Sequence, residues 1–380
     1  MPIKALVGLV LLLAGIGWWL QWEPPEPEEA QDLLPVQRGT TNPATASAIP
    51  RTSTQRSRIL PPGWPPSNTV AVAPGLSGST ATNGSNHVAR PQSWKPRPVL
   101  NILEAQIVLA RLGISPGPID GLDGPRTQSA LRAFQRANRL KVTGALDAGT
   151  RSRLVLHEAP YTNHVVTAAD LERLLPVGAT WLEKSRQPRL DYETIDELVA
   201  EKSRCHPKFL RQHNQAVAWS NITAGTSLMV PHVPSPSPPD RAAWIRILLS
   251  ERVLQAYDER TNLLAHFPCS IAREVENRPV GELHVSVLVS DPEYMFKPAR
   301  FPATPEARGL GSELRIPPGP NNPVGTVWIG LDRSGYGIHG TPHPERVGQA
   351  ESLGCFRLAN WNAEHLLKLA WIGLPVRVEP

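Results

Sequence analysis

The chain has 380 residues, which is more than one hydrophobic core usually needs, so we expect several domains. Its formal net charge is +5 and its sequence pI is near 9.3. This mild basic excess is not clustered into a stripe, so it does not favour nucleic-acid binding. Three cysteines are too few for a disulfide framework, and in an exported protein the leftover thiol is a candidate reactive group.

The first segment, residues 1–22, is predicted to be a membrane anchor. No charged residue occurs from Ala5 to Leu20, and a helix of this length can roughly cross a bilayer core of about 30 Å. Lys4 precedes the apolar run and glutamates follow it, so the positive-inside rule places the rest of the chain outside the cytoplasm. A cleaved signal peptide is the alternative, but no small-x-small cleavage site follows the run. We expect a protein anchored in the cytoplasmic membrane, with its other domains in the periplasm or cell envelope.

Residues 23–98 are predicted to be a disordered linker. Pro, Ser, Thr, Ala and Asn dominate this segment, and no apolar period is present in it. Such a sequence cannot bury enough apolar surface to offset the entropy of ordering the chain. We expect it to be a tether that lets the later domains work at a distance from the membrane.

Residues 99–157 have the spacing of a small bundle of three helices. The first helix starts near Leu100 and ends at Gly113, and the third starts near Asp147 or Thr150. The second carries an apolar stripe of Ala130, Leu131, Phe134 and Ala137. The stretches LARLG, IDGLDGPRTQSALRAFQ and VTGALDAGT resemble the peptidoglycan-binding type 1 domain. The resemblance implies cell-wall binding by this module.

Residues 160–235 predict a segment in the order strand, helix, helix, strand. Apolar residues share one face of the first helix, and AGTSLMVP is typical of a closing strand. This pattern resembles a LysM domain, a glycan-binding fold, and the second half of the segment carries the resemblance. Cys205 and His206 are adjacent, but two ligands at that spacing do not make a zinc site. We interpret them as a buried thiol and a surface imidazole.

Residues 240–380 are predicted to form a mainly-β domain, either a β-sandwich or a barrel-like fold, with one helix. Polar and apolar residues alternate in six short segments, WIRILLS, RVLQAYD, LLAHFPCSI, HVSVLVS, VGTVWIGL and LPVRVE. Cys269 lies in the third segment and is interpreted as part of the core. The helix is predicted in NAEHLLKLAWIG, with Asn362 as its candidate cap and Gly373 as its candidate end.

Cys355 and His339 are candidates for a nucleophile and its base. A thiol becomes nucleophilic when its pKa, about 8.5 when free, is lowered or when a base stands beside it. Gly354 leaves room for a carbonyl substrate, and the N–H groups of Gly354 and Cys355 could line an oxyanion hole. Ser352 could fix the imidazole through a hydrogen bond, and Arg357 could hold a substrate carboxylate as a fork. From spacing alone, a buried structural thiol remains an alternative.

The motifs YGIHGT, SLGCFRLAN and GLPVRV resemble the YkuD-type L,D-transpeptidase catalytic domain, over roughly residues 244–379. The resemblance implies that Cys355 is the nucleophile and His339 the general base, with three supporting residues, Ser352, Gly354 and Arg357. Leu353 stands where many members of the family have a second histidine, so His339 is the better base.

His343 is a weaker candidate for the base. A zinc site formed by His339, His343 and Cys355 is an alternative that the motif makes unnecessary, and we expect no metal or organic cofactor.

Together, these resemblances predict a cell-wall enzyme whose partners are peptidoglycan and, through residues 1–22, the membrane, but not nucleic acid. The implied substrate is a tetrapeptide stem: the thiol releases its terminal D-Ala, and the resulting thioester passes to a second stem as a 3-3 cross-link. Water could resolve the same acyl-enzyme, as in an L,D-carboxypeptidase, or a protein lysine could do so and attach that protein to the wall. A non-catalytic wall-binding scaffold is the remaining alternative.

Overall fold

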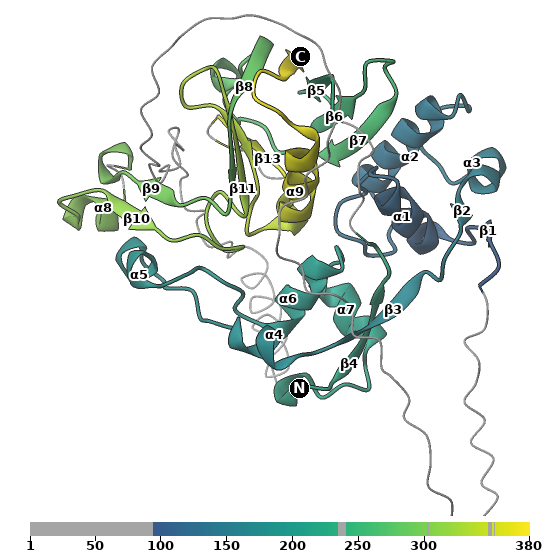
Figure 1. The fold of residues 1–380 in the computed structure, drawn as a ribbon, viewed down its shortest axis with the longest axis horizontal. Coiled ribbons are helices and arrows are strands. Elements are labelled where there is room, and N and C mark those ends of the chain that lie inside the picture. The colour runs from purple at the N-terminus through teal and green to yellow at the C-terminus, as the bar shows by residue number, and fades with distance from the viewer. Residues whose placement is uncertain (1–93, 235–240, 302–303, 349–351, 353) are drawn as a thin grey trace, which may run out of the picture. The chain divides into compact units, whose positions relative to one another are not determined.

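The computed structural model describes residues 94–234, 241–301, 304–348, 352 and 354–380 (Figure 1). The expected membrane anchor at residues 1–22 lies outside the described residues, as does most of the expected linker. Among the described residues, none of the helices combines the length and the apolar character needed to cross a membrane. We call residues 94–157 the N-terminal module, residues 160–234 the middle module and residues 241–380 the C-terminal domain.

The N-terminal module contains the three helices that its apolar spacing predicts, together with a short ladder of two strands. Its elements are α1 (Ile102–Arg111), α2 (Pro125–Ala137), α3 (Ala148–Arg153) and the antiparallel pair β1 (Arg97–Pro98) and β2 (Val155–Leu156). Asp147, rather than Thr150, caps α3, because its carboxylate accepts the Thr150 N–H at 2.8 Å. In the predicted stripe of α2, Ala137 is exposed in the last turn and Ala133 is buried in its place.

Ordered structure begins before the predicted end of the linker at residue 98. The indole N–H of Trp94 donates to the carbonyl oxygen of Leu156 at 3.0 Å, and Arg97 makes two hydrogen bonds, of 2.7 and 2.8 Å, to Glu104. The composition of residues 94–98 did not indicate this order, because their partners lie elsewhere in the chain.

The middle module has the predicted order of strand, helix, helix and strand. Its outer strands, β3 (Tyr161–Val165) and β4 (Ser227–Pro231), pair antiparallel, and α6 (Ile195–Lys202) and α7 (Pro207–His213) lie between them in sequence. An insertion between β3 and α6, which the sequence did not predict, adds α4 (Ala168–Glu172) and α5 (Trp181–Arg186). Both helices start at a threonine that forms a capping box, a local signal for a helix start.

Cys205 and His206 have structural roles in this module. The Cys205 side chain is buried in the module's apolar core, and the His206 imidazole accepts the Lys208 N–H at the start of α7.

The C-terminal domain is built on a sheet of eight strands in the order β13-β12-β11-β8-β14-β5-β6-β7. In chain order the strands are β5 (Trp244–Leu248), β6 (Val253–Tyr257), β7 (Leu263–Pro268), β8 (Gly281–Ser290), β11 (Val327–Leu331), β12 (Gly337–His339), β13 (Phe356–Arg357) and β14 (Pro375–Glu379). Only the pairs β12–β13 and β14–β5 are parallel. Ser270, just after β7, exchanges two backbone hydrogen bonds of 3.0 and 3.1 Å with Arg357 of β13. The two edges of the sheet therefore meet, so the domain is barrel-like and not a sandwich of two sheets.

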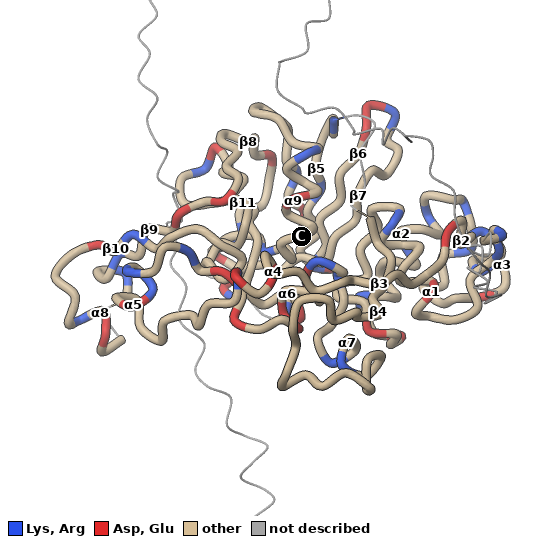
Figure 2. Tube along the Cα trace, turned by 60° about the horizontal axis from the view of Figure 1, so that its bottom comes forward, with Lys and Arg blue, Asp and Glu red and all other residues tan. Residues whose placement is uncertain are grey.

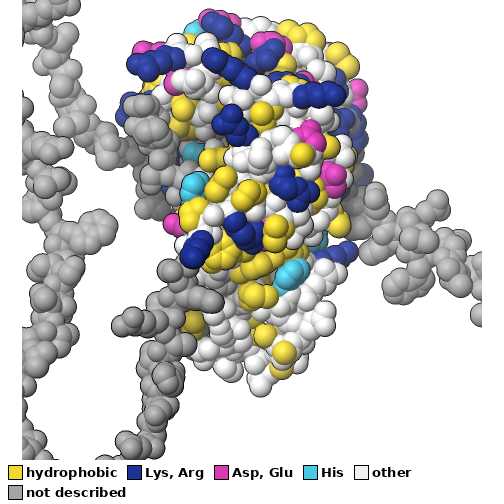
Figure 3. Space-filling view, turned by 90° about the vertical axis from the view of Figure 1, so that its right-hand side faces the viewer, with side chains coloured by type: hydrophobic (Ala, Val, Ile, Leu, Met, Phe, Trp, Pro, Cys, Tyr) yellow, Lys and Arg dark blue, Asp and Glu magenta, His cyan; other side chains and the backbone are white. Residues whose placement is uncertain are grey.

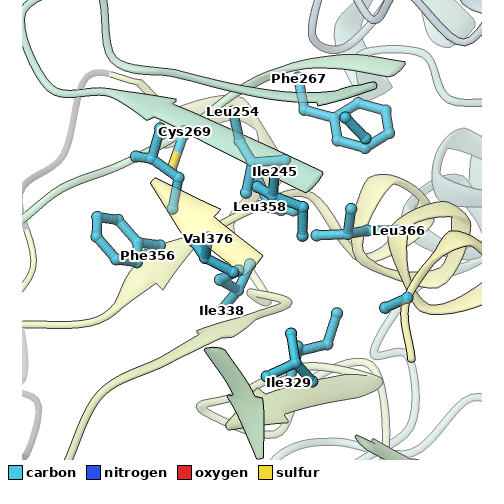
Figure 4. Close-up of a cluster of buried hydrophobic side chains, with 14 of the residues drawn as sticks. Ile245, Leu254, Phe267, Cys269, Ile329, Ile338, Phe356, Leu358, Leu366 and Val376 are labelled. Carbon is cyan, nitrogen blue, oxygen red and sulfur yellow. The ribbon is translucent and has the colours of Figure 1, made fainter. Parts of the chain in front are cut away.

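The inward faces of these strands fill one hydrophobic core, which is drawn in Figure 4. Cys269 is fully buried in this core, as its position on a predicted strand indicated. Helix α9 (Asn360–Leu369) adds Leu366 and Leu369 to the core. Burial of apolar surface, worth about 25 cal/mol per Å², is the main term that holds such a curled sheet together.

Two predictions about α9 were wrong. The helix starts at Asn360 with Ala359 in the cap position, and Asn362 lies inside the first turn, where it donates to the Ser115 hydroxyl at 3.1 Å. The helix ends at Leu369, before Gly373. Asn362 was a reasonable cap by residue type, but it bonds the N-terminal module instead of its own helix.

The sequence also did not reveal a second helix in this domain. A hairpin of β9 (Tyr294–Phe296) and β10 (Leu314–Ile316) stands apart from the large sheet, and α8 (Pro305–Gly309) lies between its strands in sequence. These elements are too short to show a clear period in the sequence.

Charged residues of both signs recur along the described elements (Figure 2). On the face drawn in Figure 3, Lys and Arg side chains are separated by hydrophobic and other side chains.

Candidate active site

The register of three neighbouring strands places His339 beside an aromatic ring. His339, at the end of β12, pairs with Trp328 of β11 on one side and with Arg357 of β13 on the other. Its imidazole stacks on the Trp328 indole, with ring centroids 5.6 Å apart and an interplanar angle of 20°. Gly337 makes this possible, because a Cβ there would lie only 2.7 Å from the indole.

The same register brings Cys355 to the same face of the sheet as His339. Side chains alternate along a strand, and the partners Ile338 and Phe356 both point into the core of the curled sheet. His339 and Cys355, one residue away from those partners, therefore lie on the opposite face. Cys355 belongs to a second apolar cluster that contains Trp328, and only 3% of its surface is exposed. Its thiol donates to the Gly335 carbonyl oxygen at 3.5 Å.

The hydrogen bonds of His339 define which ring nitrogen can accept a proton. Nδ1 lies 2.6 Å from the carbonyl oxygen of Gly340, which can only accept, so Nδ1 carries the hydrogen. Nε2 is then the basic nitrogen. It is buried and has no hydrogen-bond partner among the described residues. Burying a lone pair without a hydrogen-bond partner costs free energy of folding. A general base needs such a free lone pair to accept the proton of the nucleophile.

Burial keeps the imidazole neutral. Loss of solvation and, to a smaller extent, the positive charge of Arg357 lower the pKa of His339 to about 3, against the opposing effect of the hydrogen bond to the Gly340 carbonyl. The ring is therefore an uncharged base at neutral pH, as proton abstraction from a thiol requires.

Ser352 does not have the role that we predicted for it. Its hydroxyl donates to the carbonyl oxygen of Cys355 at 2.5 Å and accepts the Gly354 N–H at 3.3 Å. The imidazole is oriented by Gly340 instead. Ser352 thus closes the turn that carries the nucleophile candidate, and the Gly354 N–H, an expected oxyanion donor, is directed at Ser352.

The other two sequence candidates are placed differently from one another. Arg357 is the cross-strand partner of His339 and close enough to lower its pKa. The His343 side chain is mostly exposed, and its Nδ1 lies 3.9 Å from Glu345. His343 therefore lies at the surface near Glu345.

The β9–β10 hairpin and the insertion of the middle module both contribute to the apolar cluster around Cys355. Phe296 of β9 and Leu190 of the insertion are fully buried members of it. A cavity of about 400 Å³ lies beside this cluster, and its lining includes Ala307 and Leu310, which also pack in the cluster, and the charged residues Lys297, Arg308 and Glu313.

Sequence reasoning did not single out several residues that shape this site. Trp328 lies in a predicted strand and Gly337 lies in the motif YGIHGT, but only the register shows that they support the imidazole. Asn360 stands in the quoted stretch SLGCFRLAN, yet nothing in its spacing indicated a buried amide. Trp181 and Leu190 belong to the insertion that the sequence did not predict.

Comparisons with known proteins agree on the class of both outer parts of the chain. Residues 242–378 match the family model described as "L,D-transpeptidase catalytic domain", and residues 100–154 match the one described as "Putative peptidoglycan binding domain". A Bacillus licheniformis protein named "Putative L,D-transpeptidase YkuD" is 28% identical over 189 residues, which cover 50% of this chain and 94% of that protein. A Bacillus subtilis protein named "Putative L,D-transpeptidase YqjB" is 36% identical over 105 residues, or 26% of this chain and 51% of that protein.

Among solved structures, an L,D-transpeptidase from Xylanimonas cellulosilytica aligns with 76% of this chain and 100% of its own, at 15% identity and a TM-score of 0.30. The sequence matches, and not this alignment, carry the assignment. They identify residues 242–378 as a YkuD-type L,D-transpeptidase catalytic domain and residues 100–154 as a peptidoglycan-binding domain, so the chain carries an L,D-transpeptidase catalytic domain joined to a peptidoglycan-binding domain.

Proposed function

We propose that this enzyme uses Cys355 as a nucleophile on peptidoglycan tetrapeptide stems and forms 3-3 cross-links in the cell wall. The observation that carries the proposal is the basic Nε2 of His339, which is buried, lacks a hydrogen-bond partner within the described part of the chain, and lies on the same face of the sheet as the Cys355 thiol. A neutral base beside a thiol is the arrangement that nucleophilic catalysis by cysteine needs.

The first half-reaction transfers an acyl group to sulfur. His339 Nε2 takes the thiol proton as the sulfur attacks the carbonyl carbon of the third stem residue, at its L-centre. The C–N bond to the terminal D-Ala then breaks, and the imidazolium returns its proton to the leaving amine. The product is a thioester between Cys355 and the shortened stem.

The second half-reaction transfers that acyl group to an amine. The side-chain amine of a second stem attacks the thioester, and His339 accepts a proton from that amine. The C–S bond breaks, and His339 passes the proton to the sulfur, which leaves as the thiol. The new amide bond joins the third residues of two stems. No metal or organic cofactor enters either half-reaction.

Two further residues would assist by charge and hydrogen bonding. Arg357, beside the imidazole, carries the fork of donors that fits a stem carboxylate. The Cys355 N–H would stabilise the oxyanion, and the Gly354 N–H would join it once the substrate displaces the Ser352 hydroxyl.

The proposed location of the enzyme, in the cell envelope, rests on peptidoglycan as its partner. A peptidoglycan-binding module on the same chain raises the local concentration of stems near the catalytic domain. The middle module, with its order of strand, two helices and strand, would add glycan binding of the LysM type. An anchor at residues 1–22 would hold these domains at the outer face of the cytoplasmic membrane.

Product analysis tests the reaction and its acceptor. The full-length chain is incubated with a tetrapeptide-stem muropeptide, and the products are separated by mass beside a Cys355→Ala control. Cross-linked dimers with loss of one D-Ala are expected. Tripeptide stems alone would indicate a carboxypeptidase, and stems transferred only to an added protein lysine would indicate protein attachment. If a folded protein consumes no stem, the chain is a wall-binding scaffold and the proposal fails.

A further inference from the structure

The carbonyl group that orients His339 belongs to a peptide unit that is held from its other edge. Gly340 O accepts the imidazole Nδ1–H at 2.6 Å, and the N–H of the same peptide unit, that of Thr341, donates to Asn360 Oδ1 at 3.0 Å. A peptide unit is planar, and its C=O and N–H point in opposite directions. Whatever fixes the N–H therefore also fixes the direction of the carbonyl.

Asn360 is confined tightly enough to act as that fixed point. Its side chain is fully buried, and Oδ1 also accepts the Thr326 N–H at 3.2 Å. The amide oxygen enters a space that only glycines can provide, since a Cβ at Gly325 or Gly340 would lie 2.0 or 2.1 Å from it. With two donors on Oδ1, the side-chain amide has one allowed orientation, because the flipped amide would set NH₂ against two N–H groups.

The other end of this amide reaches the middle module. Asn360 Nδ2 donates to Glu201 Oε1 at 3.0 Å and to the Pro320 carbonyl oxygen at 3.3 Å. Glu201 lies on α6, and the Tyr192 hydroxyl is within 3.4 Å of the same carboxyl oxygen. A continuous path of hydrogen bonds and one peptide plane thus links α6 to the imidazole of the catalytic domain.

We propose that Asn360 is a positioning residue for the His339 imidazole and that Glu201 of the middle module fixes the amide that does so. The middle module is then part of the catalytic apparatus and not only a tethered wall-binding unit. The inference deepens the proposed function, and its kinetic consequences rest on that function, but the state of the imidazole can be measured without substrate.

The test measures which nitrogen of His339 carries the hydrogen. The full-length chain is labelled with ¹⁵N-histidine, and long-range ¹H–¹⁵N spectra are recorded at neutral pH, with His339→Gln used to assign the signal. In the unmodified chain, His339 should show the Nδ1–H form. In Asn360→Ala, the released Gly340 carbonyl should let the ring populate both tautomers, and kcat with a tetrapeptide stem should fall by about 100-fold with little change in KM.

Variants of Glu201 keep the test decisive if Asn360→Ala does not fold. Glu201→Leu removes one of the two acceptors of the Asn360 amide and leaves the Pro320 carbonyl, so it should shift the His339 signal in the same direction, by a smaller amount. Glu201→Gln keeps an acceptor oxygen and should restore the Nδ1–H form.

Asn214→Ala is the matched control, because Asn214 is a buried amide with three hydrogen bonds to Leu210 and Met229 and none to the site. It should lower the melting temperature without moving the His339 signal. If folded Asn360→Ala or folded Glu201→Leu shows the unchanged Nδ1–H form, the positioning role is wrong. That result would not argue against Cys355 as the nucleophile. If instead the unmodified chain shows the Nδ1–H form but is not acylated by a stem, only the proposed function is contradicted.

Discussion

Trp181 of the middle module stacks on Phe296 of the β9–β10 hairpin, with ring centroids 4.3 Å apart and an interplanar angle of 13°. Glu306, in the first turn of α8, accepts the Trp181 N–H at 2.6 Å and so fixes the start of α5. Phe296 belongs to the apolar cluster that contains Cys355, and Trp181 packs against that cluster. The insertion of the middle module thus holds the hairpin against the buried thiol.

Removing this stack should expose the thiol. Aromatic pairs of this kind contribute about 0.5–1.5 kcal/mol beyond their buried area, so Trp181→Ala should raise the population of hairpin-open molecules by up to about tenfold. The measurement is the alkylation rate of Cys355 by iodoacetamide, followed by mass; Cys205 and Cys269 are buried elsewhere.

Trp244→Ala is the matched control for this substitution. Trp244 stacks on Tyr257 with nearly the same geometry, 4.4 Å and 12°, but on β5 and β6. Its loss should leave the alkylation rate unchanged. Equal acceleration by both variants would show general loosening and not a specific contact over the thiol.

Gly340→Ala should be strongly destabilising, whereas Gly354→Ala should fold. A Cβ at Gly340 would lie 2.1 Å from Asn360 Oδ1, but a Cβ at Gly354 would meet only the Tyr336 ring at 3.6 Å, an ordinary contact. Overpacking of a closed site costs about 1–3 kcal/mol or more. Urea titration measures the difference in the free energy of unfolding, and similar midpoints for the two variants would contradict this account.

The acid limit of activity should lie far below the ordinary histidine pKa. Burial lowers the pKa of His339 to about 3, so its imidazole stays neutral as the pH falls through 6.5, where an exposed histidine would take up a proton. The profile of kcat/KM against pH reports free-enzyme groups and should show no loss near pH 6.5 that depends on His339. His339→Gln should lower kcat by about 10²- to 10⁴-fold at neutral pH. An acid limb near pH 6.5 in the unmodified enzyme would mean that the base is solvated.

Glu201 should make the fold less stable as the pH rises. Burial raises the pKa of Glu201 to about 8, while in the unfolded chain it is about 4.3. Between these values the folded protein keeps a proton that the unfolded chain has lost, so unfolding is favoured by up to about 1.4 kcal/mol per pH unit. The free energy of unfolding of Glu201→Gln should therefore exceed that of the unmodified chain by an amount that is near zero at pH 4 and grows toward pH 8. Glu259→Gln, which removes an exposed carboxylate from the β6–β7 turn, is the control and should show no such trend.

The sequence predicted those parts of the fold that have a strong local signal. The six alternating segments became strands of the large sheet, and the caps and apolar stripes located the helices of the N-terminal module. The motif around Cys355 and His339 indicated the two residues that the register of β12 and β13 then brings to one face.

The rest depends on contacts between residues far apart in the chain. Asn362 looked like a helix cap, but it bonds Ser115, 247 residues away in sequence. Ser352 looked like a partner of the imidazole, but the backbone of the neighbouring Gly340 occupies that position. The link from Glu201 to Asn360 joins two modules, and no local pattern reports a hydrogen bond of that kind.

The central claim is that Cys355 forms a thioester with a peptidoglycan stem. The most direct measurement is the intact mass of the full-length chain after brief incubation with a tetrapeptide-stem muropeptide, beside Cys355→Ala. We predict an adduct with the mass of the stem less D-Ala on the unmodified chain and none on the variant. The same adduct on Cys355→Ala, or no adduct on a folded unmodified chain, would contradict the account.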